Sequence, residues 1–411
     1  MTDCFFSIGK LSFLMDGGFG SSGKAKIASY ITKNANNWQF ACNAFGPQAG
    51  HTVIDNGKRY FYQTFNSCAY QDNYEKLYIG PGACIELPAF FREIDESNIN
   101  PKKIGVHPLV TILQDKDAAY ERGEVDLDGN PIKHEGTKKN GSTLHGVGAN
   151  RARRILRRHD NILARDTSKL KEFLCNTSEE IMDRLDDGQS GLCEIAQGFP
   201  LSLMGDFFPH CTSRNVTVAA TLDDMMIPPK YVGNVLLNLR TYPIRINSRK
   251  FICKESGKYL TWVEVQDYNK TGRQYDVYEG NSGGWYDDQQ ELTWDDITRL
   301  SGSKEKILEI TSVTKLPRRV STFSRKNLDD AIRHNMPPSN GAIFLSVNFS
   351  NYVDGDLLGT RSYSDLLKSP KMLTWIDDNI ILSCKKFSSV DNNIIMKFVG
   401  TGPNTDDMIV L

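Results

Sequence analysis

Two glycines and a lysine near the start of the chain are spaced for phosphate binding. Gly18, Gly23 and Lys24 follow the pattern Gly-x4-Gly-Lys. In such a loop, backbone N–H groups and the N-terminus of the next helix surround phosphate oxygens, while the lysine supplies positive charge. The following residue is Ala25, where an ordinary loop of this kind has a Ser or Thr that binds magnesium. We therefore predict phosphate binding with any metal held elsewhere.

The segments around this loop predict the elements that position it. Residues 5–15 form an apolar run typical of a buried strand, and residues 25–35 have the composition of a helix. Further strands are predicted at residues 76–79, 104–108, 341–347 and 379–384. The mixture predicts an α/β fold, P-loop-like, with a largely parallel central sheet flanked by helices and long functional loops. We expect a single domain over residues 1–411, with a polar excursion at about residues 118–148.

Composition limits the kinds of partner. The 411 residues carry a formal net charge of -1, which gives no general field for nucleic acid or an anionic membrane, so phosphate binding must be local. The nine cysteines are scattered without a CxxC pair and are expected to be mostly buried thiols of a reducing compartment. No apolar run approaches the roughly 20 residues of a membrane span. We expect a cytoplasmic protein, in the host cytoplasm if the chain is viral.

Short motifs follow the glycine loop in a definite order. After Gly20-Ser-Ser-Gly-Lys-Ala-Lys26 come Gln48-Ala-Gly-His-Thr52, Gly141-Ser-Thr143, Ala196-Gln-Gly198, Pro209-His-Cys-Thr-Ser-Arg-Asn215, Pro229-Lys-Tyr-Val232, residues 313–319 and Thr401-Gly-Pro403. This order resembles the adenylosuccinate synthetases, whose segments read GDEGKGK, NAGHT, TT, AQG, YPxVTSSN, PRYV, VTTGRxR and STGP. The resemblance spans essentially the whole chain and implies that family's fold and a carbon–nitrogen ligase.

The resemblance also implies a chemistry. In that family, GTP phosphorylates O6 of IMP and the amine of aspartate displaces the phosphate. An aspartate of the first loop removes the N1 proton and helps to hold Mg²⁺, while the histidine of NAGHT acts as an acid on O6. By position, His51 matches the acid, Lys24 the phosphate-binding cation and Ser21 the catalytic aspartate. Serine is a weak base and a weak magnesium ligand, so Ser21 does not simply repeat the aspartate's task.

Two departures indicate a different choice of nucleotides. Besides Ser21, residues 345–350 lack the carboxylate with which the family's TKxD segment selects guanine. This pattern resembles the viral branch of the family, which makes a precursor of 2-aminoadenine. The branch implies dGMP, L-aspartate, and ATP or dATP as substrates, with Mg²⁺ as cofactor. A small neutral Ser21 would leave room for the 2-amino group of guanine.

The resemblance assigns residues to each substrate. Catalytic residues are Ser21, His51 and Lys24. Triphosphate contacts are expected from Gly20, Ser22, Gly23, Lys24, Ala25, Lys26, Gly50, His51, Thr52, Arg319, Asn348, Gly400, Thr401, Gly402 and Pro403. Purine-nucleotide contacts are expected from Ser21, Gln48, Ala49, Ser142, Thr143, Arg157, Gln197, Thr212 and Ile246. Aspartate contacts are expected from Val313, Thr314, Lys315, Leu316, Pro317, Arg318 and Arg319, and metal contacts from Ser21 and Gly50.

Arg157 belongs to the basic run 151–158, which composition alone predicts to be a solvated helix face. By resemblance it reaches the 5′-phosphate of a neighbouring subunit's nucleotide, which implies a homodimer. Pro317 falls, in an alignment without gaps, where the family has an arginine that also contacts the ribose 2′-hydroxyl. Proline offers no donor there, so we expect a preference for the deoxy sugar.

Three alternatives remain open from the sequence. One is a divergent adenylosuccinate synthetase that uses IMP and GTP. Another is a nucleotide-binding protein without ligase activity, suggested by the missing catalytic aspartate. The third is a P-loop phosphohydrolase or switch, which would have to accommodate Ala25.

Overall fold

A nine-stranded sheet forms the centre of the molecule, as seen in a computed structural model that describes residues 2–137, 140–246, 249–256, 259–260, 262–279, 282–311, 316–338, 340–389 and 393–411. The strand order is β19-β18-β17-β10-β1-β9-β2-β5-β7, and its described pairs are parallel except β18 with β19. The bounds are β1 Leu11–Asp16, β2 Phe40–Asn43, β5 Lys76–Ile79, β7 Ile104–Val106, β9 Gly191–Gly198, β10 Val232–Arg240, β17 Ala342–Asn348, β18 Asn393–Gly400 and β19 Met408–Val410. The predicted fold class is confirmed.

The central strands are apolar because both faces of the sheet are covered. Every residue of β1 is buried. Leu11, Phe13 and Met15 join one hydrophobic core and Leu14 joins the other. Successive side chains of a strand point to opposite faces, so a strand between two layers reads as a continuous apolar run.

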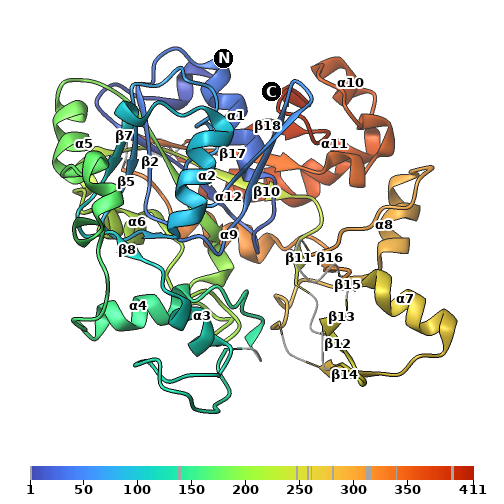
Figure 1. Cartoon of the computed structure of the whole chain (residues 1–411). Coiled ribbons are helices and arrows are strands. Elements are labelled where there is room, and N and C mark those ends of the chain that lie inside the picture. The colour runs from blue at the N-terminus through green and yellow to red at the C-terminus, as the bar shows by residue number, and fades with distance from the viewer. Residues whose placement is uncertain are drawn as a thin grey trace.

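Helices lie on both faces of this sheet (Figure 1). α1 Lys24–Asn34 and α2 Leu87–Ser97 pack on the core that holds Leu14. α5 Thr177–Asp186, α6 Val218–Met225 and α9 Arg325–His334 pack on the other core, together with α8 Trp294–Ser301, α10 Tyr363–Leu367, α11 Pro370–Ile376 and α12 Leu382–Phe387. The predicted strand, glycine loop and helix at the N-terminus are thus β1, residues 17–23 and α1.

Smaller units extend below the sheet in Figure 1. On one side are α3 Asp115–Glu121 and α4 Val147–Ile155, between which runs most of the polar segment predicted at residues 118–148. On the other side are α7 Trp262–Thr271 and two small sheets, of β11 Ile244–Arg245, β16 Arg319–Ser321 and β15 Glu291–Leu292, and of β13 Tyr259–Leu260, β12 Arg249–Cys253 and β14 Tyr275–Glu279. The remaining pairs are the hairpin β3 His51–Asp55 with β4 Lys58–Tyr62, and β6 Cys84–Ile85 with β8 Thr111–Ile112.

One predicted strand is wrong, and another begins later than expected. Residues 379–384 lie in a π-helical turn, Asp377–Ile381, and in α12. Ile380 and Cys384 are buried four residues apart, which is helical spacing, and a short apolar run does not distinguish the two structures. The first strand starts at Leu11, because Asp3–Phe5 form a 3-10 turn. The cysteines are free thiols and mostly buried, as expected.

Candidate active site

The glycine loop has the backbone of an anion-binding site. Gly20, Ser21 and Gly23 have φ angles of 90°, 53° and 79°, and Gly23 leads directly into α1. No side chain caps the N-terminus of α1, which leaves its first N–H groups without a side-chain acceptor. Lys24 and Lys26 stand in the first turn, where the helix dipole disfavours cations. A bound anion would stabilise both the N–H groups and the lysines.

Asp16 at the end of β1 fastens the start of this loop. Its Oδ1 accepts a hydrogen bond from Gly18 N at 2.8 Å, and its Oδ2 accepts from Ser22 N at 3.2 Å and Ser22 Oγ at 2.5 Å. Burial raises the pKa of Asp16, although these hydrogen bonds and Lys24 oppose that rise. The sequence argument missed this role, although Asp16 is the one acidic residue of the cluster 16–24.

Two asparagines join the loop to neighbouring strands. Asn238 of β10 donates to Ser22 O at 3.0 Å and to Ser22 Oγ at 2.7 Å. Asn348, at the end of β17, donates to Ser22 O at 2.9 Å and to Asn238 Oδ1 at 3.0 Å. A Cβ atom on Gly400 would stand 1.7 Å from Asn348 Oδ1, so only glycine fits there. Asn348, a predicted triphosphate contact, therefore lies against the glycine loop, and Gly400 of a second predicted segment packs on Asn348.

Glu194 of β9 brings two predicted catalytic residues together. Lys24 Nζ donates to Glu194 Oε1 at 2.6 Å, and the two side chains are 7% and 0% exposed. His51 Nδ1 lies 3.0 Å from the same oxygen. Ser67 donates to this carboxylate from both N and Oγ, each at 2.8 Å. Lysine, imidazole and carboxylate thus form one buried cluster from α1, β3 and β9.

The charges of this cluster depend on one another. Burial acts to raise the pKa of Glu194, but Lys24 and His51 outweigh it and hold the pKa of this carboxyl well below its usual range. Burial, followed by Lys24, lowers the pKa of His51, and Glu194 opposes them. Glu194 is not among the predicted site residues, although it is a carboxylate inside an apolar strand, two residues before the Ala-Gln-Gly motif.

Ser21 is held by its backbone. Its carbonyl oxygen accepts a hydrogen bond from Arg240 Nη1 at 2.8 Å, while the residue itself is exposed. Arg240 is buried, pairs with Glu309, and has its guanidinium 4.0 Å from the ring centre of Phe349. The loop position that we expect to match the family's aspartate is therefore tied to β10 through its backbone and is exposed.

Lys26 fastens the C-terminal segment to α1. Its Nζ donates to Gly402 O at 2.8 Å and to Asp407 O at 3.0 Å. Burial lowers the pKa of Lys26 to about 7, with Asp407 opposing. Thr401 Oγ1 donates to Thr360 O at 2.6 Å, so the segment predicted to contact the triphosphate is anchored on two sides.

The predicted purine-nucleotide residues come from several elements, and the segment that holds Gln197 is next to the glycine loop. Gln197, with φ of 72°, precedes Gly198, the last residue of β9, where a Cβ atom would stand 1.9 Å from Gly18 O. Ile246 contacts the position of Gly141, because a Cβ atom there would lie 2.9 Å from its Cδ1. The remaining predicted residues lie in loops: Gln48 and Ala49 before β3, Ser142 and Thr143 before α4, and Thr212, whose N donates to Leu201 O at 2.9 Å.

The predicted aspartate-binding segment is only partly described, since Val313, Thr314 and Lys315 lie outside the described residues. Leu316 packs with Phe251 and Val265 in a hydrophobic cluster, so its side chain serves packing. Arg318 N donates to Glu309 O at 2.9 Å, which pairs the two flanks of the segment. Arg319 donates to Glu291 Oε2 at 2.7 Å and to Ser282 Oγ at 3.0 Å.

The basic run at residues 151–158 is not a uniform solvated face. Arg153 Nη2 lies 2.7 Å from Asp117 Oδ1, and both side chains are 1% exposed. Arg154 Nη1 donates to Pro81 O at 2.7 Å and to Leu109 O at 2.8 Å. Arg157 is exposed, with φ of 53°, directly after α4. Two arginines therefore hold α4 in place, and the predicted contact of Arg157 with a neighbouring subunit stays a prediction.

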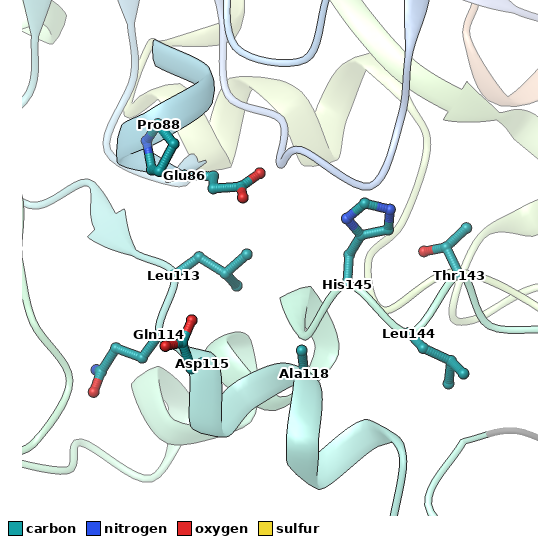
Figure 2. A pocket seen from close by; sticks show the side chains of 9 residues that line it. All are labelled: Glu86, Pro88, Leu113, Gln114, Asp115, Ala118, Thr143, Leu144 and His145. Atoms are coloured by element: carbon teal, nitrogen blue, oxygen red, sulfur yellow. The ribbon is translucent and has the colours of Figure 1, made fainter. Parts of the chain in front are cut away.

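A pocket of about 260 Å³ lies between α2, α3 and the loop before α4 (Figure 2). It is lined by Glu86, Pro88, Leu113, Gln114, Asp115, Ala118, Thr143, Leu144 and His145. Only Thr143 among these is a predicted site residue, and two carboxylates disfavour a phosphate. This pocket therefore does not coincide with the predicted catalytic residues, which lie at the glycine loop and around Glu194.

The fold is that of a nucleotide-binding α/β protein, in which a glycine loop with the backbone of an anion-binding site follows the central strand β1 of a largely parallel sheet. The family model for adenylosuccinate synthetase matches residues 14–168. The N6-succino-2-amino-2'-deoxyadenylate synthase of Vibrio phage phiVC8 is 30% identical over 353 residues, which cover 84% of this chain and 86% of the relative. The adenylosuccinate synthetase of Pyrococcus horikoshii is 27% identical over 321 residues, 75% of this chain and 89% of the relative.

Solved structures agree. The succinoaminodeoxyadenylate synthetase of cyanophage S-2L, bound to dGMP and to dATP as an energy donor, has a TM-score of 0.69 and 25% identity, covering 97% of this chain and 94% of that chain. The adenylosuccinate synthetase of Plasmodium falciparum shares the fold, with a TM-score of 0.71 and 15% identity over 98% of this chain and all of that one (100%). The chain belongs to the adenylosuccinate synthetase family. It is an enzyme, a carbon–nitrogen ligase.

Among the described residues, no three His, Cys, Asp or Glu side chains are grouped to hold a metal ion. The helices in the described part of the chain are too short or too polar to cross a bilayer.

Proposed function

We propose that this enzyme joins L-aspartate to C6 of dGMP, with ATP or dATP as the energy donor. The products are N6-succino-2-amino-2'-deoxyadenylate, ADP or dADP, and phosphate. The observation that carries this proposal is Ser21, a small neutral side chain at the exposed loop position where the family has an aspartate. Two relatives support it: the phage synthase named for this product, and the cyanophage enzyme described with dGMP and dATP.

The cluster around Lys24 suits the proposed reaction. The γ-phosphoryl group passes to O6 of the purine, and the aspartate amine then displaces phosphate from C6. The Lys24 ammonium, at the N-terminus of α1, would bind the transferred phosphoryl group, where positive charge lowers the barrier. His51, beside Lys24, would hold the proton at O6.

The choice of both nucleotide bases follows from two carboxylates that this chain lacks, at position 21 and within residues 345–350. A carboxylate at position 21 would crowd the 2-amino edge of guanine, and the serine removes it. At the triphosphate base, residues 345–350 offer no carboxylate for guanine, and the amide of Asn348 is already bonded to Ser22. An adenine triphosphate is therefore the donor that the chain's own residues favour.

Mg²⁺ fits this site only as a partner of the triphosphate. The donors available to it are neutral oxygens of Ser21 and Gly50, both exposed, because the Asp16 carboxylate is bonded to the loop itself. Magnesium commonly binds through few protein oxygens, with phosphates and waters completing its shell. When bound, it would neutralise phosphate charge. A homodimer, with Arg157 reaching the neighbouring subunit's nucleotide, is part of the same proposal.

The test is a substrate matrix. Purified enzyme is incubated with aspartate and dGMP, GMP or IMP, each paired with ATP, dATP or GTP, and products are identified by chromatography and mass spectrometry. We expect a succinylated guanine nucleotide with ATP or dATP. Activity confined to IMP with GTP would refute the proposal, and triphosphate hydrolysis that needs no aspartate would refute the ligase reaction for this substrate set.

A further inference from the structure

Glu194 contacts both Lys24 and His51. In the proposed reaction, Lys24 acts on the phosphoryl group and His51 acts on O6 of the purine. Glu194 Oε1 receives Lys24 Nζ at 2.6 Å and lies 3.0 Å from His51 Nδ1. Ser67 donates to both carboxylate oxygens, at 2.8 Å each, and so fixes the carboxylate. The residues before Ser67 are fixed in turn, because Glu93 accepts from the N–H groups of residues 63–65.

We propose that Glu194 is a positioning residue with two effects. It competes with the triphosphate for Lys24, and it keeps His51 in place when Lys24 contacts phosphate. The proposal rests on the proposed function, which assigns Lys24 to the transferred phosphoryl group. Beyond that function, it assigns a role to Glu194. The carboxylate lowers the affinity for the triphosphate and in return holds His51, the acid.

The physical argument is a competition between anions. Phosphate oxygens and the Glu194 carboxylate attract the same ammonium, and a charge pair with both members buried is strong when its geometry is good. The carboxylate does not follow Lys24 toward phosphate, because Ser67 donates a hydrogen bond to each of its oxygens. Its nearest remaining charged or titratable neighbour is then His51, whose ring also packs on Phe45 at 4.9 Å.

This competition predicts effects of opposite sign from one substitution. Glu194→Gln keeps the shape of the side chain but removes the carboxylate that Lys24 contacts, so an anionic ligand gains affinity. We expect the β,γ-imido analogue of ATP to bind on the order of tenfold more tightly in calorimetry. The same variant should lose on the order of tenfold or more in kcat, because His51 loses the carboxylate that orients it. A residue with a merely structural role would not improve binding.

Three further variants complete the test. Glu93→Gln is the matched control, since it alters a buried carboxylate that binds backbone N–H groups, and binding of the analogue should not tighten. In a Lys24→Met background, Glu194→Gln should no longer change affinity. Ser67→Ala keeps both charges but removes one donor from Oε1, so the Lys24 pair strengthens and analogue affinity should fall by about threefold.

The outcomes are distinct. Unchanged or weaker binding in Glu194→Gln overturns the proposal, and if that variant does not fold, unchanged or tighter binding in Ser67→Ala overturns it instead. If Lys24→Met itself binds the analogue normally, the phosphate assignment of Lys24 fails and the proposal falls with it. Turnover of IMP instead of dGMP would refute the proposed purine substrate. Glu194→Gln should then still tighten binding of the analogue and lower kcat.

Discussion

Glu93 should make a separable contribution to the stability of this enzyme, and this contribution should decrease as pH rises from about 4.5 to about 7. Glu93, on α2, is 1% exposed. Its carboxyl accepts hydrogen bonds from Gln63 N at 2.7 Å and from Thr64 N and Phe65 N, each at 3.1 Å. Burial raises its pKa from 4.5 to about 7, against the effect of these hydrogen bonds.

The sign follows from proton uptake. Between pH 4.5 and about 7 the folded protein holds a proton on Glu93 that the unfolded chain has lost, so folding is favoured at low pH. The contribution is fully present below pH 4.5 and is lost as pH rises through about 7. At about 1.4 kcal/mol per pH unit, this pKa difference corresponds to a loss on the order of 3 kcal/mol.

Urea unfolding of the wild type and Glu93→Gln at pH 5, 6, 7 and 8 isolates this contribution. Glutamine does not ionise, but it can no longer accept all three hydrogen bonds, so the variant should be less stable than wild type at pH 5 by about 1 kcal/mol. The difference should move in favour of the variant by on the order of 3 kcal/mol by pH 8. Glu96→Gln, an exposed change on the same helix, is the control for lost charge. Parallel stability curves for wild type and Glu93→Gln would refute the reasoning.

The other predictions concern catalysis, selectivity and one buried ion pair. His51→Ala should lower kcat at least about 100-fold with nucleotide affinity nearly unchanged, and near-normal turnover would remove His51 from the mechanism. Ser21→Asp should fold normally, since aspartate tolerates a φ of 53°, but lose turnover of dGMP; undiminished turnover would mean that Ser21 does not select the base. Arg153→Met should lower the unfolding free energy by about 3–5 kcal/mol because Asp117 is left buried and unpaired, and a loss below about 1 kcal/mol in thermal or urea unfolding would contradict this. If Pro317 replaces an arginine that binds the ribose hydroxyl, kcat/KM for dGMP should exceed that for GMP about tenfold, and equal values would refute that role.

Spacing along the chain was sufficient for the elements that lie close together in sequence. The glycine loop between β1 and α1 follows from Gly18, Gly23 and Lys24, since a phosphate loop needs only a strand, a turn of small residues and a helix N-terminus in succession. The strands at residues 76–79 and 342–348 were foreseen from their apolar runs. The order of motifs indicated the family, because separate motifs in sequence order are hard to produce by chance.

Spacing along the chain does not predict contacts between residues that are far apart in the sequence. A short apolar run fits a helix as well as a strand, because packing against the sheet determines which of them forms. Residues 382–387 form a helix, and residues 393–400 form a strand. Glu194 and Asn238 are polar residues in buried strands, and their partners Lys24 and Ser22 are 170 and 216 positions away in the sequence. Parallel pairing of β1 with β9 and β10 brings the ends of those strands to one edge, where Lys24 and Ser22 meet them. Buried polar groups need hydrogen-bonding or oppositely charged partners. The assembled sheet brings these partners together, and their contacts form the predicted reacting centre.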